Sequence, residues 1–130
     1  MILADTSVWI DYFAGRETSA VARLDAAIED REIVMGDLIL VEVLQGAGSE
    51  HKLRQIARKL SPIPCVVLCG PDVAPDAAAN YRALRRRGVT VRGTIDVIIA
   101  TWCIRNGAQL LHNDRDFVAM EGHLSLAVWR

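Results

Sequence analysis

Carboxylate side chains stand at the borders of apolar stretches in four separate parts of this sequence. Asp5 follows the residues ILA, Glu42 interrupts LILVEVL, Asp96 lies near the start of TIDVIIATW, and Asp114 comes soon after QLLH, with Asp116 two residues later. Removing a carboxylate from water without a partner costs several kcal/mol. If these acids come together in the fold, their mutual repulsion also requires a counter-charge.

A divalent metal ion is the counter-charge that such a set of oxygen ligands suits best. Carboxylate oxygens bind hard cations such as Mg²⁺ and Mn²⁺. A cation of this kind lowers the pKa of a bound water molecule and neutralises charge on phosphate oxygens, and two of them would lie about 3.5–4 Å apart. The acids therefore indicate hydrolysis of phosphodiester bonds with one or two metal ions.

Each acid also has an ordinary structural explanation when it is considered alone. Asp96 near a helix start complements the helix dipole, and Asp114 and Asp116 are typical turn or cap residues. Glu42 can reach solvent from a helix. Asp5 is the hardest to explain in this way, and the recurrence of the pattern in four segments favours a shared site.

The elements that would position these acids alternate between short apolar strands and helices. We expect strands at Ile2–Ala4, Ile33–Met35, Cys65–Cys69, Gln109–His112 and Leu124–Val128. We expect helices from Thr6 or Ser7 to Gly15, over Thr18–Asp30, from an Asp37 cap to Leu44, over Glu50–Leu60 and Asp76–Arg87, from a Thr94 cap to Gly107, and near Asp116–Met120. The alternation predicts an α/β fold, a three-layer α/β/α sandwich with a mostly parallel central sheet.

This fold class predicts where the acids meet. In parallel sheets, ligands bind beyond the carboxyl ends of the strands. Asp5 and Asp114 would both emerge at that edge, and the helix start that holds Asp96 can reach it. A chain of 130 residues, 52% of them hydrophobic, fits a single domain over residues 1–130.

Composition and cysteine content narrow the setting. The net charge is −1, so no overall positive field marks a nucleic-acid partner. The cysteines are odd in number and have no CxxC spacing, which argues against a disulfide framework or a zinc site and favours the reducing cytoplasm. No apolar run reaches 18 residues, so we expect neither a membrane span nor a signal peptide.

Arginine is concentrated in one strip of the sequence. Arg85, Arg86 and Arg87 are consecutive, and Arg92 follows in the segment that leads to Asp96. Guanidinium groups donate to phosphate in a fork geometry. The position of the strip next to Asp96 in the sequence favours contact with a nucleic-acid substrate, and the alternative is a solvated helix face.

Four stretches together carry a resemblance to a known family. ILADTSVWIDYF, EVLQG, DVIIATW and LLHNDRDF resemble, in order and spacing, the four motifs of PIN-domain nucleases, and most closely the VapC ribonuclease toxins of bacterial toxin–antitoxin pairs. The similarity covers nearly the whole chain and implies one PIN-like domain. It implies an endoribonuclease that depends on Mg²⁺, with Mn²⁺ as a substitute, and that acts as a toxin on RNA. It also implies an antitoxin partner and a homodimer.

The resemblance assigns roles to residues of this chain. It implies that Asp5, Glu42, Asp96 and Asp114 are catalytic, with Asp5, Asp96 and Asp114 holding the metal. Thr6 would be a supporting hydroxyl, and Asp116 a ligand or a neighbour of the ligands. His112 departs from the family pattern, which often has threonine there. Its imidazole could orient an acid or a water, or could belong to the core.

Other functions fit the residues less well. A phosphatase of the haloacid dehalogenase type needs a second acid two residues after the first, where this chain has Ser7. A receiver domain needs a lysine late in the chain, and the last lysine here is Lys59. A non-enzymatic module with this fold would have lost its acids. A nuclease acting on single-stranded or flap DNA remains the enzymatic alternative, because attack by metal-activated water does not need a 2′-hydroxyl.

Overall fold

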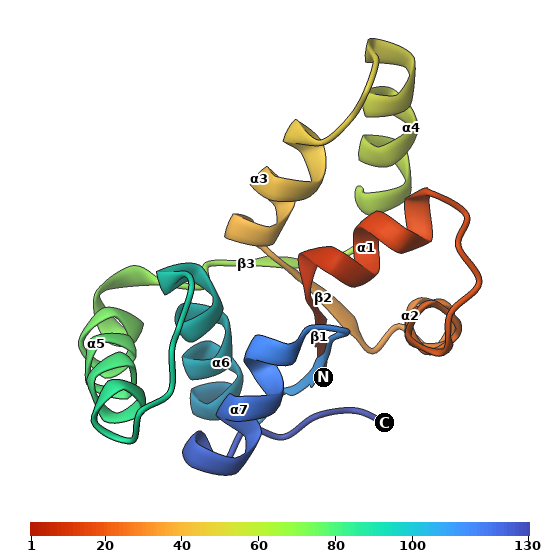
Figure 1. The fold of residues 1–130 in the computed structure, drawn as a ribbon. Coiled ribbons are helices and arrows are strands. Elements are labelled where there is room, and N and C mark those ends of the chain that lie inside the picture. Colours follow the sequence, from red (N-terminus) through yellow and green to blue (C-terminus); the bar gives the residue numbers. More distant parts are fainter.

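The computed structural model describes residues 1–130 as four strands and seven helices (Figure 1). The strands are β1 (Ile2–Ala4), β2 (Ile33–Gly36), β3 (Cys65–Val66) and β4 (Gln109–Leu111). The helices are α1 (Thr6–Phe13), α2 (Ser19–Glu29), α3 (Asp37–Gln45), α4 (Glu50–Leu60), α5 (Gly70–Arg86), α6 (Thr94–Asn106) and α7 (Arg115–Leu124). None of these helices combines the length and the apolarity that crossing a membrane requires.

The strands form one parallel sheet in the order β3-β2-β1-β4. Leu3 of β1 pairs with Val34 on one side and Leu110 on the other. β1 is buried along its whole length, which explains its uninterrupted apolar sequence. Because all the strands run in one direction, the residues that follow β1, β2 and β4 emerge at the same edge of the sheet.

Helices cover both faces of the sheet and confirm the predicted α/β/α sandwich. In Figure 1, α5 and α6 lie to the left of the strands, and α1, α2 and α4 lie to the right. The buried apolar side chains form one contiguous cluster of 29 residues that runs from both helical layers into the sheet. The acids of interest lie at the rim of this core, where strands end and helices begin.

Three predicted elements differ most from the structure. The strand expected at Cys65–Cys69 is only Cys65–Val66, because the backbone N–H of Leu68 donates to the Asp37 carboxylate and turns the chain away from the sheet. α5 starts at Gly70 and not at Asp76, with Pro75 accommodated inside the helix. The strand expected at Leu124–Val128 is absent, because α7 continues to Leu124 and only an isolated bridge joins Leu110 to Val128.

The helix caps also differ from those predicted. Asp5, and not Thr6 or Ser7, caps α1, with its side chain accepting from the backbone N–H of Ser7. Gly93 caps α6, so that Thr94 is the first helical residue. Asp37 is likewise the first residue of α3 and follows a Gly36 cap. In each case the cap lies one or two residues before the predicted one. The strand or loop that precedes the helix ends at that earlier residue.

Candidate functional site

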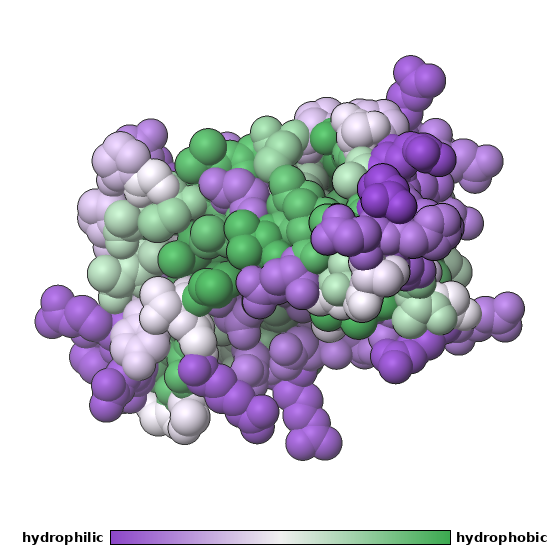
Figure 2. Space-filling view, turned by 90° about the horizontal axis from the view of Figure 1, so that it is seen from above, coloured by the Kyte–Doolittle hydropathy of each residue, from purple (hydrophilic) through white to green (hydrophobic).

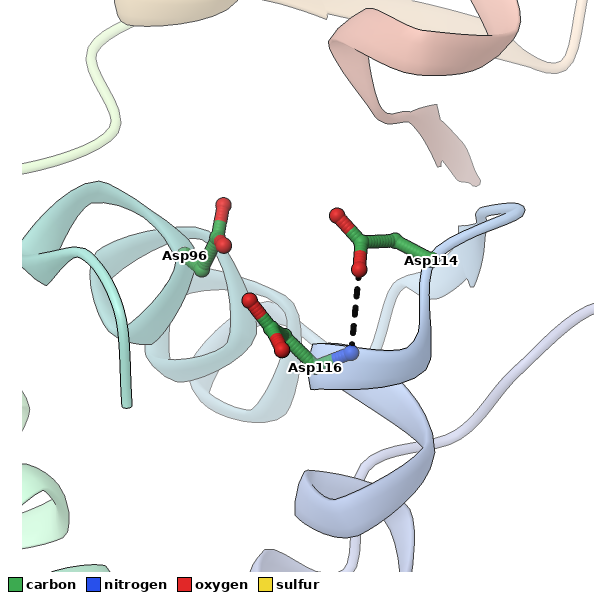
Figure 3. Close-up of side chains that lie close together, drawn as sticks. All are labelled: Asp96, Asp114 and Asp116. Atoms are coloured by element: carbon green, nitrogen blue, oxygen red, sulfur yellow. Dashed lines mark hydrogen bonds between the residues drawn. The ribbon is translucent and has the colours of Figure 1, made fainter. Parts of the chain in front are cut away.

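Three carboxylates from two helix starts lie together at the edge of the sheet (Figure 3). Asp96 is in the first turn of α6, Asp114 caps α7, and Asp116 is in the first turn of α7. One carboxylate oxygen from each lies within 4.8 Å of the other two. Asp114 uses one oxygen to accept the backbone N–H of Asp116 at 3.0 Å, and its other oxygen is turned toward Asp96. The two helix N-termini favour negative charge at this point.

Asp5 lies beside this group as a buried cap. The residue is only 5% exposed, and its Oδ2 accepts from the Ser7 hydroxyl at 2.8 Å and from the Ser7 backbone N–H at 3.3 Å. Burial raises the pKa of Asp5, the hydrogen bonds from Ser7 and from the backbone of Thr6 lower it, and the charge of Asp114 raises it, so that the pKa lies above its usual value. Asp5 is therefore both a helix cap and a neighbour of the acids.

Glu42 reaches the site from α3 through a hydroxyl. The Thr6 hydroxyl donates to Oε1 of Glu42 at 2.8 Å, which joins α1 to α3. Thr6, which was predicted to support the site with its hydroxyl, therefore holds Glu42. The hydroxyl that contacts Asp5 is that of Ser7, which was not predicted. The signal for Ser7 was its position two residues after an aspartate at a helix start, where side chains and N–H groups commonly bond to a cap.

The pKa of Asp96 shows that all these acids share one electrostatic environment. Burial is the largest cause of its rise to about 6, and the charges of Asp5, Asp114, Asp116 and Glu42 contribute in the same direction. We call these five residues the acidic cluster. They come from four separate stretches of sequence, and the repulsion that the sequence predicts among them is present in the fold.

The acidic cluster has no basic side chain as counter-charge. The ion pairs of the protein involve the carboxylates of Asp11, Asp76 and Glu121, none of which belongs to the cluster. Its donors are carboxylate oxygens without nitrogen or sulfur, and Asp96, Asp114 and Asp116 each offer one within 4.8 Å of the others. This donor set fits a hard divalent cation such as Mg²⁺ or Mn²⁺. Asp116, whose role the sequence left open, lies inside that group of three.

The predicted substrate-binding arginines divide into two groups. Arg85 and Arg87 lie at the end of α5, which runs away from the start of α6 (Figure 1). The Arg85 guanidinium lies 6.0 Å from the centre of the Tyr81 ring, and Arg87 donates to the His123 carbonyl at 3.0 Å, near the end of α7. Arg92 is exposed and lies two residues before α6 and four residues before Asp96 in the sequence. The run that includes Arg86 is therefore separated from the start of α6, whereas Arg92 belongs to the segment that leads directly into that helix.

His112 does not contact a carboxylate of the acidic cluster. Its side chain is 5% exposed, and its ring nitrogens contact the Asp114 backbone N–H and the side chain of Glu121. The imidazole also packs against buried Phe117, with 5.1 Å between ring centres. The ring is therefore buried, and it reaches Asp114 only through the backbone N–H of that residue.

Comparison with known proteins places this geometry in a family. The family model described as PIN domain matches residues 2–122. Ribonuclease VapC11 of Mycobacterium tuberculosis is 36% identical over 121 residues, covering 90% of this chain and 89% of the relative, and a VapC ribonuclease of Mycobacterium bovis matches to the same extent.

Solved structures share the fold at lower sequence identity. A DNA-bound VapBC from Salmonella typhimurium has a TM-score of 0.79 at 19% identity, covering 98% of this chain and 96% of the other. VapBC2 from Rickettsia felis, bound to a promoter DNA fragment, has a TM-score of 0.74 at 18% identity and full coverage of both chains. The family match over nearly the whole chain, with relatives above one-third identity, shows that this protein belongs to the PIN-domain family.

Proposed function

We propose that this protein is a metal-dependent endoribonuclease and the toxin of a toxin–antitoxin pair. The observation that carries the proposal is the acidic cluster at the carboxyl edge of the parallel sheet, gathered without a basic counter-charge. The names of its relatives, which are VapC ribonucleases, support the same activity. Three unpaired cysteines and an RNA substrate suit action in the cytoplasm.

The residues of the cluster have distinct tasks in this proposal. Asp5, Asp96 and Asp114 hold Mg²⁺, for which Mn²⁺ substitutes, and Asp116 adds a carboxylate to the same group. When bound, the cation supplies a water of lowered pKa and offsets charge on the phosphate oxygens. Glu42, held by the Thr6 hydroxyl, faces the same charged environment and completes the catalytic acids.

The surface next to Asp96 suits a single-stranded nucleic acid. A cavity of about 360 Å³ between α5 and α6 is lined by Tyr81, Arg82, Thr94 and Ile98 together with small side chains. Aromatic rings accept stacked bases, and guanidinium groups bind phosphates. In this proposal Arg92, four residues before Asp96, contacts the strand near the scissile bond, and Arg85–Arg87 contact phosphates farther along.

An apolar surface beside the acids suits the antitoxin. Figure 2 shows apolar surface across the middle of the face that is at the top of Figure 1. Val41 and Ile95 are large exposed apolar residues that neighbour Glu42 and Asp96 in sequence, and Val67 is a further exposed apolar residue. A protein segment that presents apolar side chains and an arginine would bind here and block the acids. We also propose that the toxin is a homodimer.

The decisive experiment is cleavage of end-labelled RNA, with single-stranded DNA of the same sequence in parallel. We expect 5′-phosphate and 3′-hydroxyl ends in Mg²⁺, no cleavage in EDTA, and no cleavage by Asp96→Asn. Asp72→Asn is the matched control, because Asp72 is an exposed aspartate in the first turn of α5, outside the cluster. Cyclic phosphate ends or full activity in EDTA would exclude this mechanism, and cleavage of DNA alone would reassign the substrate.

A further inference from the structure

His112 connects the acidic cluster to a chain of polar contacts that no metal or substrate role requires. The residue follows β4 directly, and its side chain is almost fully buried. Its Nδ1 faces the backbone N–H of Asp114 at 3.2 Å, and its Nε2 faces Oε1 of Glu121 at 3.2 Å. An N–H can donate only to an unprotonated ring nitrogen, so Nδ1 accepts and Nε2 carries the proton that it donates to Glu121.

The chain of contacts continues to Arg130. One guanidinium nitrogen of Arg130 donates to both carboxylate oxygens of Glu121, at 2.9 and 3.0 Å. Burial acts to raise the pKa of Glu121, but the hydrogen bonds from Arg130 and His112 outweigh it and lower the pKa. Glu121 is therefore held as an anion, and it fixes the imidazole by accepting from Nε2.

We propose that His112 is a positioning residue for Asp114, which rests on the function proposed above. Asp114 is held at two points, through its backbone N–H by His112 and through Oδ1 by the backbone N–H of Asp116. These two contacts fix the direction of the carboxylate and leave its second oxygen toward Asp96. The imidazole acts through Asp114 and touches neither metal nor RNA.

This arrangement explains how the chain tolerates histidine at this position. A threonine hydroxyl accepts an N–H two residues later in an ST-turn. The Nδ1 atom of His112 accepts that same N–H, so the turn that carries Asp114 is closed in an equivalent way. The imidazole adds a second contact, through Nε2, that ties the turn to α7.

Two amide variants separate the two ring nitrogens. His112→Asn keeps an acceptor near the Nδ1 position and removes the hydrogen bond to Glu121. His112→Gln keeps a donor near the Nε2 position and removes the acceptor for Asp114. We expect His112→Gln to reduce Mn²⁺ affinity and kcat by about 10-fold or more, the range found for residues that orient metal ligands, with KM for RNA unchanged. His112→Asn should stay close to wild type in all three quantities.

If His112 had a purely structural role, the two variants would rank in the opposite order. The hydrogen bond to Glu121 would then be the one that matters, so His112→Asn would be the worse variant in melting temperature and activity alike. Equal Mn²⁺ affinity for both variants and wild type would overturn the proposal. If Asp96→Asn also left Mn²⁺ binding unchanged, the proposed metal site itself would be wrong, which is a separate failure.

A spectroscopic measurement tests the wild-type protein without any variant. The ¹⁵N shifts of the His112 imidazole should show a protonated Nε2 and an unprotonated Nδ1, and the Asp114 amide should exchange slowly with solvent. A proton on Nδ1, or a fast-exchanging Asp114 amide, would refute the positioning role even if His112→Gln failed to fold.

Discussion

Replacing Asp96 by asparagine should stabilise the metal-free protein at pH 7.5, although the change removes a residue proposed to be essential. Asp96 accepts no hydrogen bond from the protein and is half-buried among four other acids. Asparagine keeps the shape of the side chain and removes its charge. The wild-type protein without metal carries the cost of burying this charge, and the repulsion from its neighbours, whereas the variant carries neither.

The pKa of Asp96 sets the size of this effect. Its rise from 3.8 to about 6 corresponds to about 3 kcal/mol if none of the interaction were screened. Because the side chain is only partly buried, solvent screening reduces this to roughly 1–2 kcal/mol. Loss of the favourable charge at the start of α6 subtracts about 0.3–1 kcal/mol. The expected net gain is about 1 kcal/mol, or about 3–5 °C in melting temperature for a domain of this size.

The dependence on pH has a definite sign. A carboxylate whose pKa is raised in the folded state binds its proton more tightly there than in the unfolded chain. The penalty is absent below pH 3.8, grows between pH 3.8 and about 6, and is complete above that range. The wild-type protein should therefore lose stability relative to Asp96→Asn as the pH rises through this window.

Thermal melts in EDTA at pH 5 and pH 7.5 test the prediction, with Asp72→Asn as the control for loss of a first-turn aspartate. With saturating Mn²⁺, the wild type should melt above Asp96→Asn. Ligand at about 100 times its dissociation constant adds about 2.7 kcal/mol to the free energy of unfolding of the wild type. If Asp96→Asn melts below the wild type in EDTA at pH 7.5, or if Asp72→Asn shows the same gain, the burial of the Asp96 charge among the other acids is not the cause.

Three further predictions concern residues around the cluster. Asp5→Asn should keep the cap of α1, whereas Asp5→Ala should lower the free energy of unfolding in urea by about 0.5–2 kcal/mol. Equal losses of stability in the two variants would show that the cap depends on charge. Thr6→Val should cost about 1 kcal/mol by freeing Glu42, and an unchanged stability would mean that water replaces the hydroxyl. Changing Arg85–Arg87 to glutamine should flatten the salt dependence of RNA binding by about 0.7 in log–log slope for each phosphate that is no longer neutralised, and an unchanged slope would leave Arg92 as the arginine to test.

Local patterns in the sequence determined the elements and the acids that border them. Charge inside or beside an apolar stretch is costly, so Asp5, Glu42 and Asp96 stood out without any knowledge of the fold. The alternation of apolar strands and helices predicted the parallel sheet, whose geometry sends Asp5 and Asp114 to one edge. These inferences succeeded because they depend on spacing along the chain and on the cost of desolvation, which are properties of the sequence itself.

The tertiary structure decided which side chains meet. Thr6 bonds to Glu42 and Ser7 to Asp5, although both hydroxyls follow the same aspartate, because successive residues of a helix point in different directions. Arg86 lies away from Asp96 although the two are close in sequence, because α5 and α6 pack side by side and the chain returns along them from the end of α5 to the start of α6 (Figure 1). His112 reaches Glu121 only because the turn after β4 sets the direction in which α7 leaves the strand. Contacts of this kind depend on how the elements pack, and spacing along the chain does not contain that information.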